Sequence, residues 1–537
     1  MKRRLLSAFL AVMMVLTMAP VAFAADTETT TEYVAQVDGN KYETLADAIE
    51  AANDGDTITL LKGGNGNGFK VPEGKFTEQG LTIDFNQFTY MIGGQLVGSA
   101  GTGTNGCQLL KNNKITFKNG SFVGATEGSK PADDTPDWHG APAIMIQNYC
   151  DLTLENMIVT GGDETVYTFS NNCGNTVIKD STINAGKAKG YRSGPFAFDV
   201  CRYSTYPSVS VTVQGSSVIN GDVEISGTIG EGQSRQLNIE DGTFNGRFIV
   251  SNTPANISIT GGKFSSDVSA YVAEGYVQNE NGTVEQLGET NAVAKIDDTY
   301  YKTLADAVAA AKADEATTIT LLKDVELPSY IYIKDKKNIT LDLNGKNITR
   351  TGNGVFYVGN AKLRVTGTGT IFENQRDGFA PIIAKGSPDD VADYTTITID
   401  ENVTLKGDYA GIFVDTDTAG KNSYHNYGLV INMKGSIDLT AIDGGVSAYG
   451  VYVQGLNKIT SGNVMQINLD GVTINTGDEA IYAAGYAKWN VKNCTFNAEN
   501  AAIEVRAGDM TIDGGVYTAM ASEFKCEANG NGSTTQG

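Results

Sequence analysis

The sequence predicts an all-β protein built from two tandem solenoids, each opened by a short helix. Two observations predict this fold class. First, YETLADAI at 42–49 with TITLLK at 57–62 returns as YKTLADAV at 301–308 with TITLLK at 318–323, an offset of about 260 residues that indicates a duplicated domain. Second, each copy contains short alternating strands at a recurring spacing, which is typical of a stacked, quasi-one-dimensional fold.

A capped helix is expected at the start of each copy. Thr44 and Thr303 are placed as N-cap residues, with Asp47 and Asp306 three positions later as in a capping box. The apolar stripes consist of Leu45, Ala48, Ile49 and Ala52 in the first copy and Leu304, Ala307, Val308 and Ala311 in the second. We expect each stripe to cover the open end of a stacked sheet, because an uncapped solenoid end exposes its core and backbone groups.

The strands after each helix recur at a spacing that suits one solenoid coil. The first copy has reference strands at 81–85, 115–117, 152–154, 177–178, 211–213, 237–239 and 257–259, and the second at 339–343, 363–365, 397–399, 431–433, 467–469, 490–491 and 511–512. Steps of about 20 to 26 residues suit a coil of three short strands, and steps of about 32 to 37 suit the same coil with a loop insertion.

The domain boundaries follow from this pattern. Residues 1–24 have a basic start, a short apolar run and an AFA cleavage site at 22–24, so we interpret them as a signal peptide. The segment 279–291 is polar and lacks the strand pattern, which places the two solenoid domains at 25–290 and 291–537. We therefore expect a secreted or extracellular protein, or one associated with the cell surface, with no transmembrane segment and no encoded anchor.

Composition restricts the partners. The formal net charge is -22, from 62 acidic and 40 basic residues, so nucleic acid and anionic polysaccharides would be repelled unless a local basic patch or a bridging cation intervened. Extracellular glycans without charge, or surface proteins, are easier ligands. We expect no cofactor, and no specific motif indicates calcium.

Six cysteines in an exported chain raise the question of disulfides. Their spacings do not repeat between the copies and contain no C-x-x-C metal pattern, so buried free thiols are the preferred interpretation. If a disulfide exists, Cys150 with Cys173, on neighbouring coils, is the best pair.

This layout of capped helix and recurring strands resembles the right-handed parallel β-helix of the pectate-lyase-like superfamily over nearly the whole mature chain. The T-L-x-D-A opening and the closing segment 261–276 are similar to modules of large repetitive bacterial surface proteins, which are often regarded as adhesins. The second copy ends on a degenerate form of that closing segment, from Gly514 onward.

The resemblance does not imply an enzyme. Pectin hydrolases of this superfamily carry N-T-D, D-D, G-H-G and R-I-K motifs, and the lyases carry calcium-binding acids with R-x-P-x-x-R. Neither set is complete, because His139 and His425 do not stand in G-H-G and Arg376 lacks the lyase spacing to Pro381. Fold alone cannot assign activity, so we lean towards a protein that is not an enzyme.

One carboxylate pair is the candidate for catalysis. If Ile412 and Val414 point inward, Asp415 and Asp417 lie on the outer face about 6.6 Å apart, close to the separation of an inverting glycosidase pair. Cation binding and a plain solvated face remain alternatives, since D-x-D occurs by chance in an acidic chain.

An aromatic ladder is the candidate for binding. Strand alternation places Phe413, Tyr452 and Tyr482 outward on three successive coils, about 4.8 Å apart, which approximates the pitch of a sugar ring. The same stack would also stabilise a sheet without any ligand. Two loop regions add further candidates because loops on a rigid scaffold commonly carry binding: Tyr191, Arg192, Arg202, Tyr203 and Trp138.

The sequence thus favours a non-catalytic adhesin or glycan- or protein-binding module of the cell exterior. A polysaccharide lyase or glycoside hydrolase with an unrecognised site is the alternative, and a structural spacer of a surface layer is the third. A cleft that collects titratable groups would favour the enzyme, and an exposed aromatic strip would favour the binder.

Overall fold

The computed structural model describes residues 32–99, 103–129, 140–188, 194–203, 205–251, 256–376, 378–415, 426–442, 447–454 and 462–526, with the backbone alone for 522–526. The expected signal peptide lies outside these residues. The chain divides into two compact units, one of residues 1–236 and 248–255 and the other of residues 237–247 and 256–537. The prediction of domains at 25–290 and 291–537 stays a prediction.

Nearly all regular structure is β-strand, as predicted, and the large sheets are parallel apart from the pairs made by β1, β2, β26 and β27. Sheet 1A has 16 strands and begins in the order β2-β1-β3-β6-β9-β11-β13-β16. Its strands are β1 Ala35–Val37, β2 Asn40–Tyr42, β3 Thr57–Leu60, β4 Gly64–Gly66, β6 Leu81–Asp84, β7 Thr89–Ile92, β9 Lys114–Gly124, β11 Asp151–Thr160, β13 Gly174–Lys179, β14 Thr182–Asn184, β16 Ser208–Gln214, β17 Val218–Asn220, β19 Ser234–Ile239, β20 Thr243–Asn245, β22 Asn256–Ile259 and β23 Lys263–Phe264.

Sheet 1B has seven strands in the order β21-β18-β15-β12-β10-β8-β5, all within the first unit. They are β5 Phe69–Val71, β8 Asn105–Leu109, β10 Ile144–Asn148, β12 Tyr167–Asn171, β15 Phe196–Cys201, β18 Asp222–Ser226 and β21 Phe248–Val250. Two short 3-10 helices, η1 Glu127–Ser129 and η2 Ser269–Tyr271, and the antiparallel hairpin β24 Tyr276–Gln278 with β25 Val284–Gln286 accompany the sheets.

The second unit contains three further sheets. Sheet 2A has ten strands: β26 Ala294–Ile296, β27 Thr299–Tyr301, β28 Ala316–Leu321, β31 Asn338–Asp342, β34 Ala361–Thr366, β37 Thr395–Ile399, β40 Leu429–Met433, β43 Gln466–Asp470, β46 Lys488–Lys492 and β49 Asp509–Asp513. Sheet 2B has eight: β29 Val325–Glu326, β32 Ile348–Arg350, β35 Gly369–Glu373, β38 Val403–Lys406, β41 Ser436–Asp438, β44 Thr473–Asn475, β47 Thr495–Ala498 and β50 Val516–Ala519. Sheet 2C has eight: β30 Ile331–Ile333, β33 Phe356–Gly359, β36 Ile382–Lys385, β39 Ala410–Val414, β42 Tyr449–Val453, β45 Glu479–Ala483, β48 Ala501–Val505 and β51 Ser522–Cys526.

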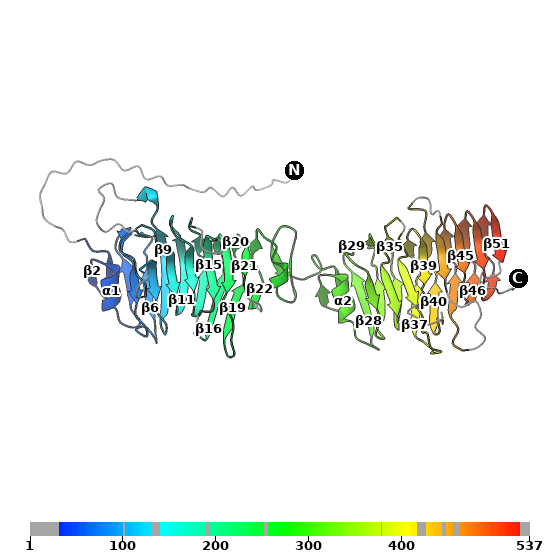
Figure 1. The fold of residues 1–537 in the computed structure, drawn as a ribbon, viewed down its shortest axis with the longest axis horizontal. Helices are drawn as coiled ribbons and strands as arrows, with labels where there is room; N and C mark the ends of the chain where they lie inside the picture. The colour runs from blue at the N-terminus through cyan, green and yellow to red at the C-terminus, as the bar shows by residue number, and fades with distance from the viewer. Residues whose placement is uncertain are drawn as a thin grey trace, which may run out of the picture. The chain divides into compact units, whose positions relative to one another are not determined.

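In the second unit each coil adds one strand to each of these three sheets. From β31 onward every strand pairs with the strand three places later in the chain, so β31 pairs with β34, β32 with β35 and β33 with β36. In Figure 1 the strands of the second copy lie side by side in chain order, from green at α2 to red at β51. The reference strands predicted from the second copy all lie in sheet 2A, which confirms the coil of three short strands.

The first copy follows the same spacing with one difference. Its predicted reference strands lie in sheet 1A, but β9 and β11 run on through the corner of the coil, and β9 pairs with both β6 and β7. Asn119 and Asn156 sit at these corners with φ of 59° and 53°. Asparagine adopts this left-handed conformation more readily than most residues, so the chain turns without ending the strand.

Side-chain alternation separates the core from the surface. In β34, Leu363 and Val365 are buried, whereas Lys362 and Arg364 point to solvent. The inward residues of successive coils form one continuous apolar cluster in the second unit, from α2 to β48. One row of amides runs along the outside. Asn468 Nδ2 donates to Asn432 Oδ1 at 2.8 Å, and Asn490 Nδ2 donates to Asn468 Oδ1 at 2.7 Å, each from the neighbouring strand.

The predicted helices and their caps are confirmed. The helix α1 spans Leu45–Ala51 and α2 spans Leu304–Ala310. Thr44 Oγ1 accepts a hydrogen bond from the Asp47 backbone N–H at 3.1 Å, and Thr303 Oγ1 accepts one from that of Asp306 at 3.0 Å. Both apolar stripes are buried, that of α2 inside the core cluster of its unit, and Figure 1 shows α2 at the end of the stack beside β28.

A lysine side chain caps the C-terminal end of each helix. Lys337 Nζ donates to the carbonyl oxygens of Val308 and Ala309 at 2.9 and 3.0 Å, and Lys75 Nζ donates to that of Ile49 at 2.8 Å. A cation at the C-terminal end of a helix satisfies free carbonyl groups and opposes the helix dipole. The duplication therefore preserved the helix together with its cation.

The preferred interpretation of the cysteines as free thiols is confirmed for the described residues, and the alternative Cys150–Cys173 disulfide is not formed. The five cysteines whose side chains the structure describes are all free thiols. Cys107, Cys150, Cys173 and Cys494 are buried, as the preferred interpretation predicted, whereas Cys201 is half-buried. Cys150 packs between strands and its thiol donates to Asn148 Oδ1 at 3.3 Å, so the group fills core space.

Replacing Leu304 and Val308 together by Asp should destabilise the second unit by several kcal/mol, because both side chains are buried against the end of its core and unpaired charges would be buried there. The matched control replaces Ala305 and Ala309, which are exposed on the same helix, by Asp. Thermal and urea unfolding measure the difference. Equal melting curves for the two variants would show that α2 does not seal the core.

Residues 25–290 and 291–537, expressed separately, should each fold, because the sheets of one copy share no strand with those of the other. Far-ultraviolet circular dichroism and cooperative thermal unfolding of each half test this. A half that stays unfolded while the whole chain folds would contradict the prediction.

Candidate functional site

The predicted aromatic ladder exists on the outer face of sheet 2C. Phe413 pairs in register with Tyr452, and Tyr452 with Tyr482, on successive strands. The ring centroids are 5.1 and 4.9 Å apart, at interplanar angles of 81° and 65°. Ile412 and Val414 point into the core, so the predicted alternation of β39 is confirmed.

Further rings enclose this ladder and form an aromatic stripe. The stripe consists of Tyr330, Tyr332, Tyr357, Phe379, Tyr409, Phe413, Tyr449, Tyr452 and Tyr482. Phe413 is 2% exposed and lies 4.6 Å from Phe379, ring to ring. Arg506 stands over the ring of Tyr482 at 4.9 Å. Since the rings pack edge-to-face against one another, much of the stripe stabilises the sheet itself.

Asp415 lies just after β39 and forms an ion pair with Lys385 on the neighbouring strand, with 3.2 Å between Oδ2 and Nζ. Asp417 lies outside the described residues, so the predicted separation of the two carboxylates stays a prediction. The ion pair gives Asp415 a structural partner in its own unit.

Among the loop candidates, Arg202 and Tyr203 lie within the described residues, whereas Trp138, Tyr191 and Arg192 lie outside them. Both follow β15, where the Arg202 guanidinium donates to the carbonyl oxygen of Thr228. Tyr203 is 53% exposed, and its ring lies 6.5 Å from that of Tyr149. Tyr206 packs on the same ring at 5.1 Å.

Tyr203 borders a hollow of about 570 Å³ on the outer face of sheet 1B, which we call the trough. The trough lies entirely in the first unit, over β10, β12, β15 and β18. Its lining residues are Ala143, Ile144, Gln147, Tyr149, Val166, Tyr167, Ser170, Asn172, Phe196, Asp199, Cys201, Tyr203, Glu224 and Ser226.

The floor of the trough is one row of polar side chains on successive strands. Gln147 pairs with Ser170, Ser170 with Asp199 and Asp199 with Glu224. The row lies outward because the residues that flank it, such as Phe198 and Val200, are in the core. The strand pairing therefore places two carboxylates side by side.

Aromatic rings stand on both sides of this floor along the strands. Tyr167 and Phe196 precede the floor residues of β12 and β15 and stack on each other, with centroids 5.0 Å apart and planes 17° from parallel. Tyr149 and Tyr203 follow the floor residues of β10 and β15. A polar floor between aromatic walls offers hydrogen-bond partners and ring faces to the same ligand.

The two carboxyl groups differ in their surroundings, although each side chain's residue is only 4% exposed. Asp199 accepts hydrogen bonds from the Asn171 backbone N–H at 2.6 Å and from Ser170 Oγ at 3.1 Å. Glu224 accepts one from the Tyr167 hydroxyl at 2.8 Å. Burial, together with the neighbouring Glu224, raises the pKa of Asp199 well above its usual range. The pair thus places a carboxyl group with a raised pKa beside a hydrogen-bond acceptor.

These two residues were not predicted from the sequence, although a signal for them was present. Asp199 is the single acid of the apolar strand FAFDVC, Glu224 shares the strand DVEIS with Asp222, and neither belongs to a known motif. Their spacing equals one coil step of the first copy, so an acid at the same outward position on consecutive coils would have indicated them. The loop candidates Arg202 and Tyr203 are the nearest residues that were predicted.

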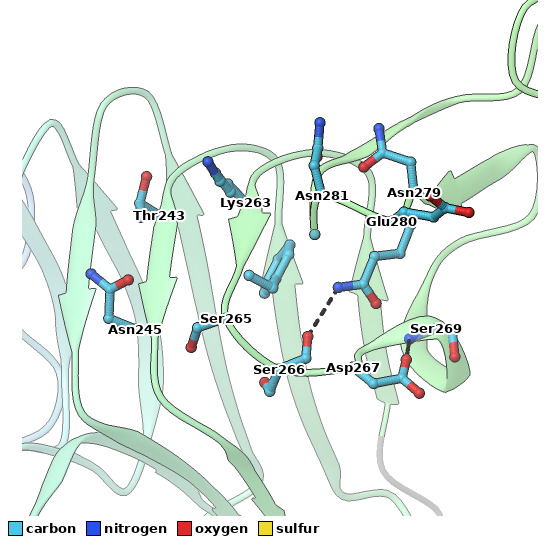
Figure 2. A pocket seen from close by; sticks show the side chains of 13 residues that line it. Thr243, Asn245, Lys263, Ser265, Ser266, Asp267, Ser269, Asn279, Glu280 and Asn281 are labelled. Atoms are coloured by element: carbon cyan, nitrogen blue, oxygen red, sulfur yellow. Dashed lines mark hydrogen bonds between the residues drawn. The ribbon is translucent and has the colours of Figure 1, made fainter.

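A second hollow, of about 640 Å³, lies where the first copy closes (Figure 2). It is lined by polar residues of β20, β23 and the hairpin, including Lys263, Asp267 and Glu280. Its polar groups already serve the turn: Gln278 Nε2 donates to the Ser266 carbonyl at 2.9 Å, and Asp267 accepts from the Ser269 backbone N–H at 2.9 Å. We therefore interpret this hollow as part of the structure that ends the first copy.

Another buried acid lies in the second unit, next to Phe379 of the stripe. Glu373, at the end of β35, is fully buried, and burial with the nearby Asp408 raises its pKa to about 7. Within the described residues, no three His, Cys, Asp or Glu side chains converge as a metal site would require. No helix among the described residues is long and apolar enough to cross a membrane.

Comparison with known proteins adds no assignment. No protein-family model matches the chain, and no curated protein matches its sequence.

The raised pKa of Asp199 predicts a pH-dependent stability. Between the ordinary aspartate pKa and the raised one, the folded protein holds a proton that the unfolded chain lacks, so stability is lost as pH rises through this range. Asp199→Asn should remove that part of the pH dependence. Urea unfolding from pH 4 to 8 measures it, and parallel curves for wild type and variant would contradict the assignment of the proton.

Proposed function

We propose that the protein is a secreted or cell-surface glycan-binding module whose main contact is the trough of the first unit. The observation that carries this proposal is the row Gln147, Ser170, Asp199 and Glu224 between aromatic walls. Sugars present hydroxyl groups at their edges and C–H groups on their faces, so they suit acceptors below and rings beside them. We further propose that the coils are right-handed and of the pectate-lyase-like type.

Size supports an oligosaccharide ligand. A hollow of about 570 Å³ lies in the range that encloses a small organic ligand. Successive floor residues are spaced by the strand separation of about 4.8 Å, which approximates the pitch of a sugar chain. The aromatic stripe of the second unit, where Tyr330 and Tyr332 are exposed, offers a second and weaker contact region.

A glycoside hydrolase is the second candidate, and the carboxylate pair favours it. Asp199, whose pKa is raised, and Glu224 have the composition of an acid and a nucleophile, and neighbouring strands bring two such side chains to roughly the 5 Å separation of retaining glycosidases. The pectinase motifs are incomplete, which argues against a known hydrolase site. Asp415 is ion-paired with Lys385, which argues against catalysis just after β39.

Replacing Tyr203 by Ala should weaken glycan binding about fivefold, because one exposed aromatic contact contributes on the order of 1 kcal/mol. Folding should not change, since the ring is 53% exposed. Tyr332→Ala, at 43% exposure in the second unit, is the matched control. A glycan array finds the ligand and calorimetry measures it. Loss of affinity only in the Tyr332 variant would move the site to the stripe.

Incubation of the mature chain with polysaccharides, followed by assays for reducing ends and unsaturated products, separates the two candidates. We expect binding without turnover. Turnover by the wild type that Glu224→Gln abolishes would replace the binding proposal by the hydrolase. Absence of both binding and turnover on every surface tested would favour the structural spacer.

A further inference from the structure

We propose that the trough recognises a protonated amine, so that its glycan is one with free amino groups, such as a glucosamine polymer. This inference rests on the proposed glycan-binding function and names the ligand class of that same site. The observation that carries it is the pair of neighbouring buried carboxyl groups, Asp199 and Glu224, in an aromatic-walled hollow.

The pair lacks a cationic partner within the part of the chain that the structure describes. Two carboxylates of the second unit do have one: Asp415 pairs with Lys385, and Asp400 with Arg364 at 2.8 Å. Asp199 and Glu224 instead meet neutral donors, namely Ser170, Tyr167 and the Asn171 backbone. A buried carboxylate without a counter-charge is unfavourable, so a cation brought by a ligand would be stabilised there.

One hydrogen-bonding atom remains for that ligand. Glu224 uses Oε2 to accept from Tyr167, and its Oε1 has no partner among the described residues. Glu224 lines the trough although the residue is only 4% exposed. An ammonium group carries three donors and no acceptor, so it can donate to Glu224 and Asp199 together from adjacent strands.

The walls favour the same chemistry. Tyr149, Tyr167, Phe196 and Tyr203 surround the floor. Aromatic faces attract cations, with contributions of about 0.5 to 2 kcal/mol for each well-placed ring. A uronate would meet like charge on the floor, and a neutral sugar would leave the charge of the pair uncompensated. The net charge of -22 also attracts a cationic polymer at low salt.

Proton release offers a readout that ordinary sugar binding does not give. The titratable groups that face Asp199 are Tyr149, Tyr167, Cys201 and Glu224, and none of these four supplies positive charge. The cation Arg235 interacts with Cys201. Because burial and Glu224 raise the pKa of Asp199, the free protein retains a proton there to higher pH than an exposed aspartate does. An ammonium ion that replaces this proton releases it, so affinity for the amine should rise with pH until the ligand amine itself loses its charge.

The test is calorimetry on the full mature chain with three tetramers: glucosamine, N-acetylglucosamine and glucose. We expect the glucosamine tetramer to bind at least about tenfold more tightly than the other two, as one added ion contact would give. Titrations in buffers of different ionisation enthalpy should show proton release for that ligand alone. Glu224→Gln should abolish the preference, while Asp415→Asn, which removes one carboxylate from the second unit, should preserve it.

Each outcome of this experiment either supports or overturns the amine inference. Equal affinity for the three tetramers, or an unchanged preference in Glu224→Gln, overturns the amine inference while the glycan-binding function stands. Absence of binding by all three, together with an empty glycan array, overturns both. Asp199→Asn serves as the second variant if Glu224→Gln unfolds, and circular dichroism melts establish which variants remain folded.

Discussion

Every feature of this protein depends on the in-register parallel pairing of successive coils. Pairing fixes which residue of one coil lies beside which residue of the next, at about 4.8 Å. Like therefore stacks on like: Leu341, Val365 and Ile399 in the core, the amide row of Asn432, Asn468 and Asn490, and the rings of Phe413, Tyr452 and Tyr482. A shift of one residue would move the whole core row of a strand to the surface, so the register is strongly specified.

The same constraint lets two copies with one scaffold carry different surfaces. The central outward row of sheet 1B contains Gln147, Ser170, Asp199 and Glu224, whereas that of sheet 2C contains Tyr357, Ile383, Phe413, Tyr452 and Tyr482. Outward positions face no core and can diverge freely, while the inward rows must stay apolar. The duplicated helix, with its Thr cap and its lysine, belongs to the conserved part because it seals the core.

The sequence could predict the fold because the fold is repetitive. A duplicated opening, alternating strands and a regular step sufficed to place the reference strands, the helices and the outward ladder at Phe413. The continuous strands β9 and β11 could not be foreseen, because they depend on backbone angles at Asn119 and Asn156 rather than on hydropathy. The Cys150–Cys173 pairing failed because neighbouring buried thiols pack as apolar groups without bonding.

The candidate site was harder to predict because it is assembled across coils. Tyr203 was found as an aromatic residue in an unusual loop, but Asp199 and Glu224 lie in separate apolar strands and acquire meaning only when the register brings them together. A sequence motif consists of residues that are close together along the chain, whereas a site on a solenoid consists of residues from successive coils that the strand pairing brings together. Single acids at matching outward positions on consecutive coils are the pattern to look for in such sequences.

A crystal structure of the mature chain soaked with a glucosamine oligosaccharide tests the central claim most directly. We expect sugar density in the trough. The sugar rings should lie against Tyr167, Phe196 or Tyr203, and an amine should lie within hydrogen-bonding distance of both Asp199 and Glu224. Density confined to the aromatic stripe, or a register in which Asp199 and Glu224 do not lie side by side on the outer face, would contradict it.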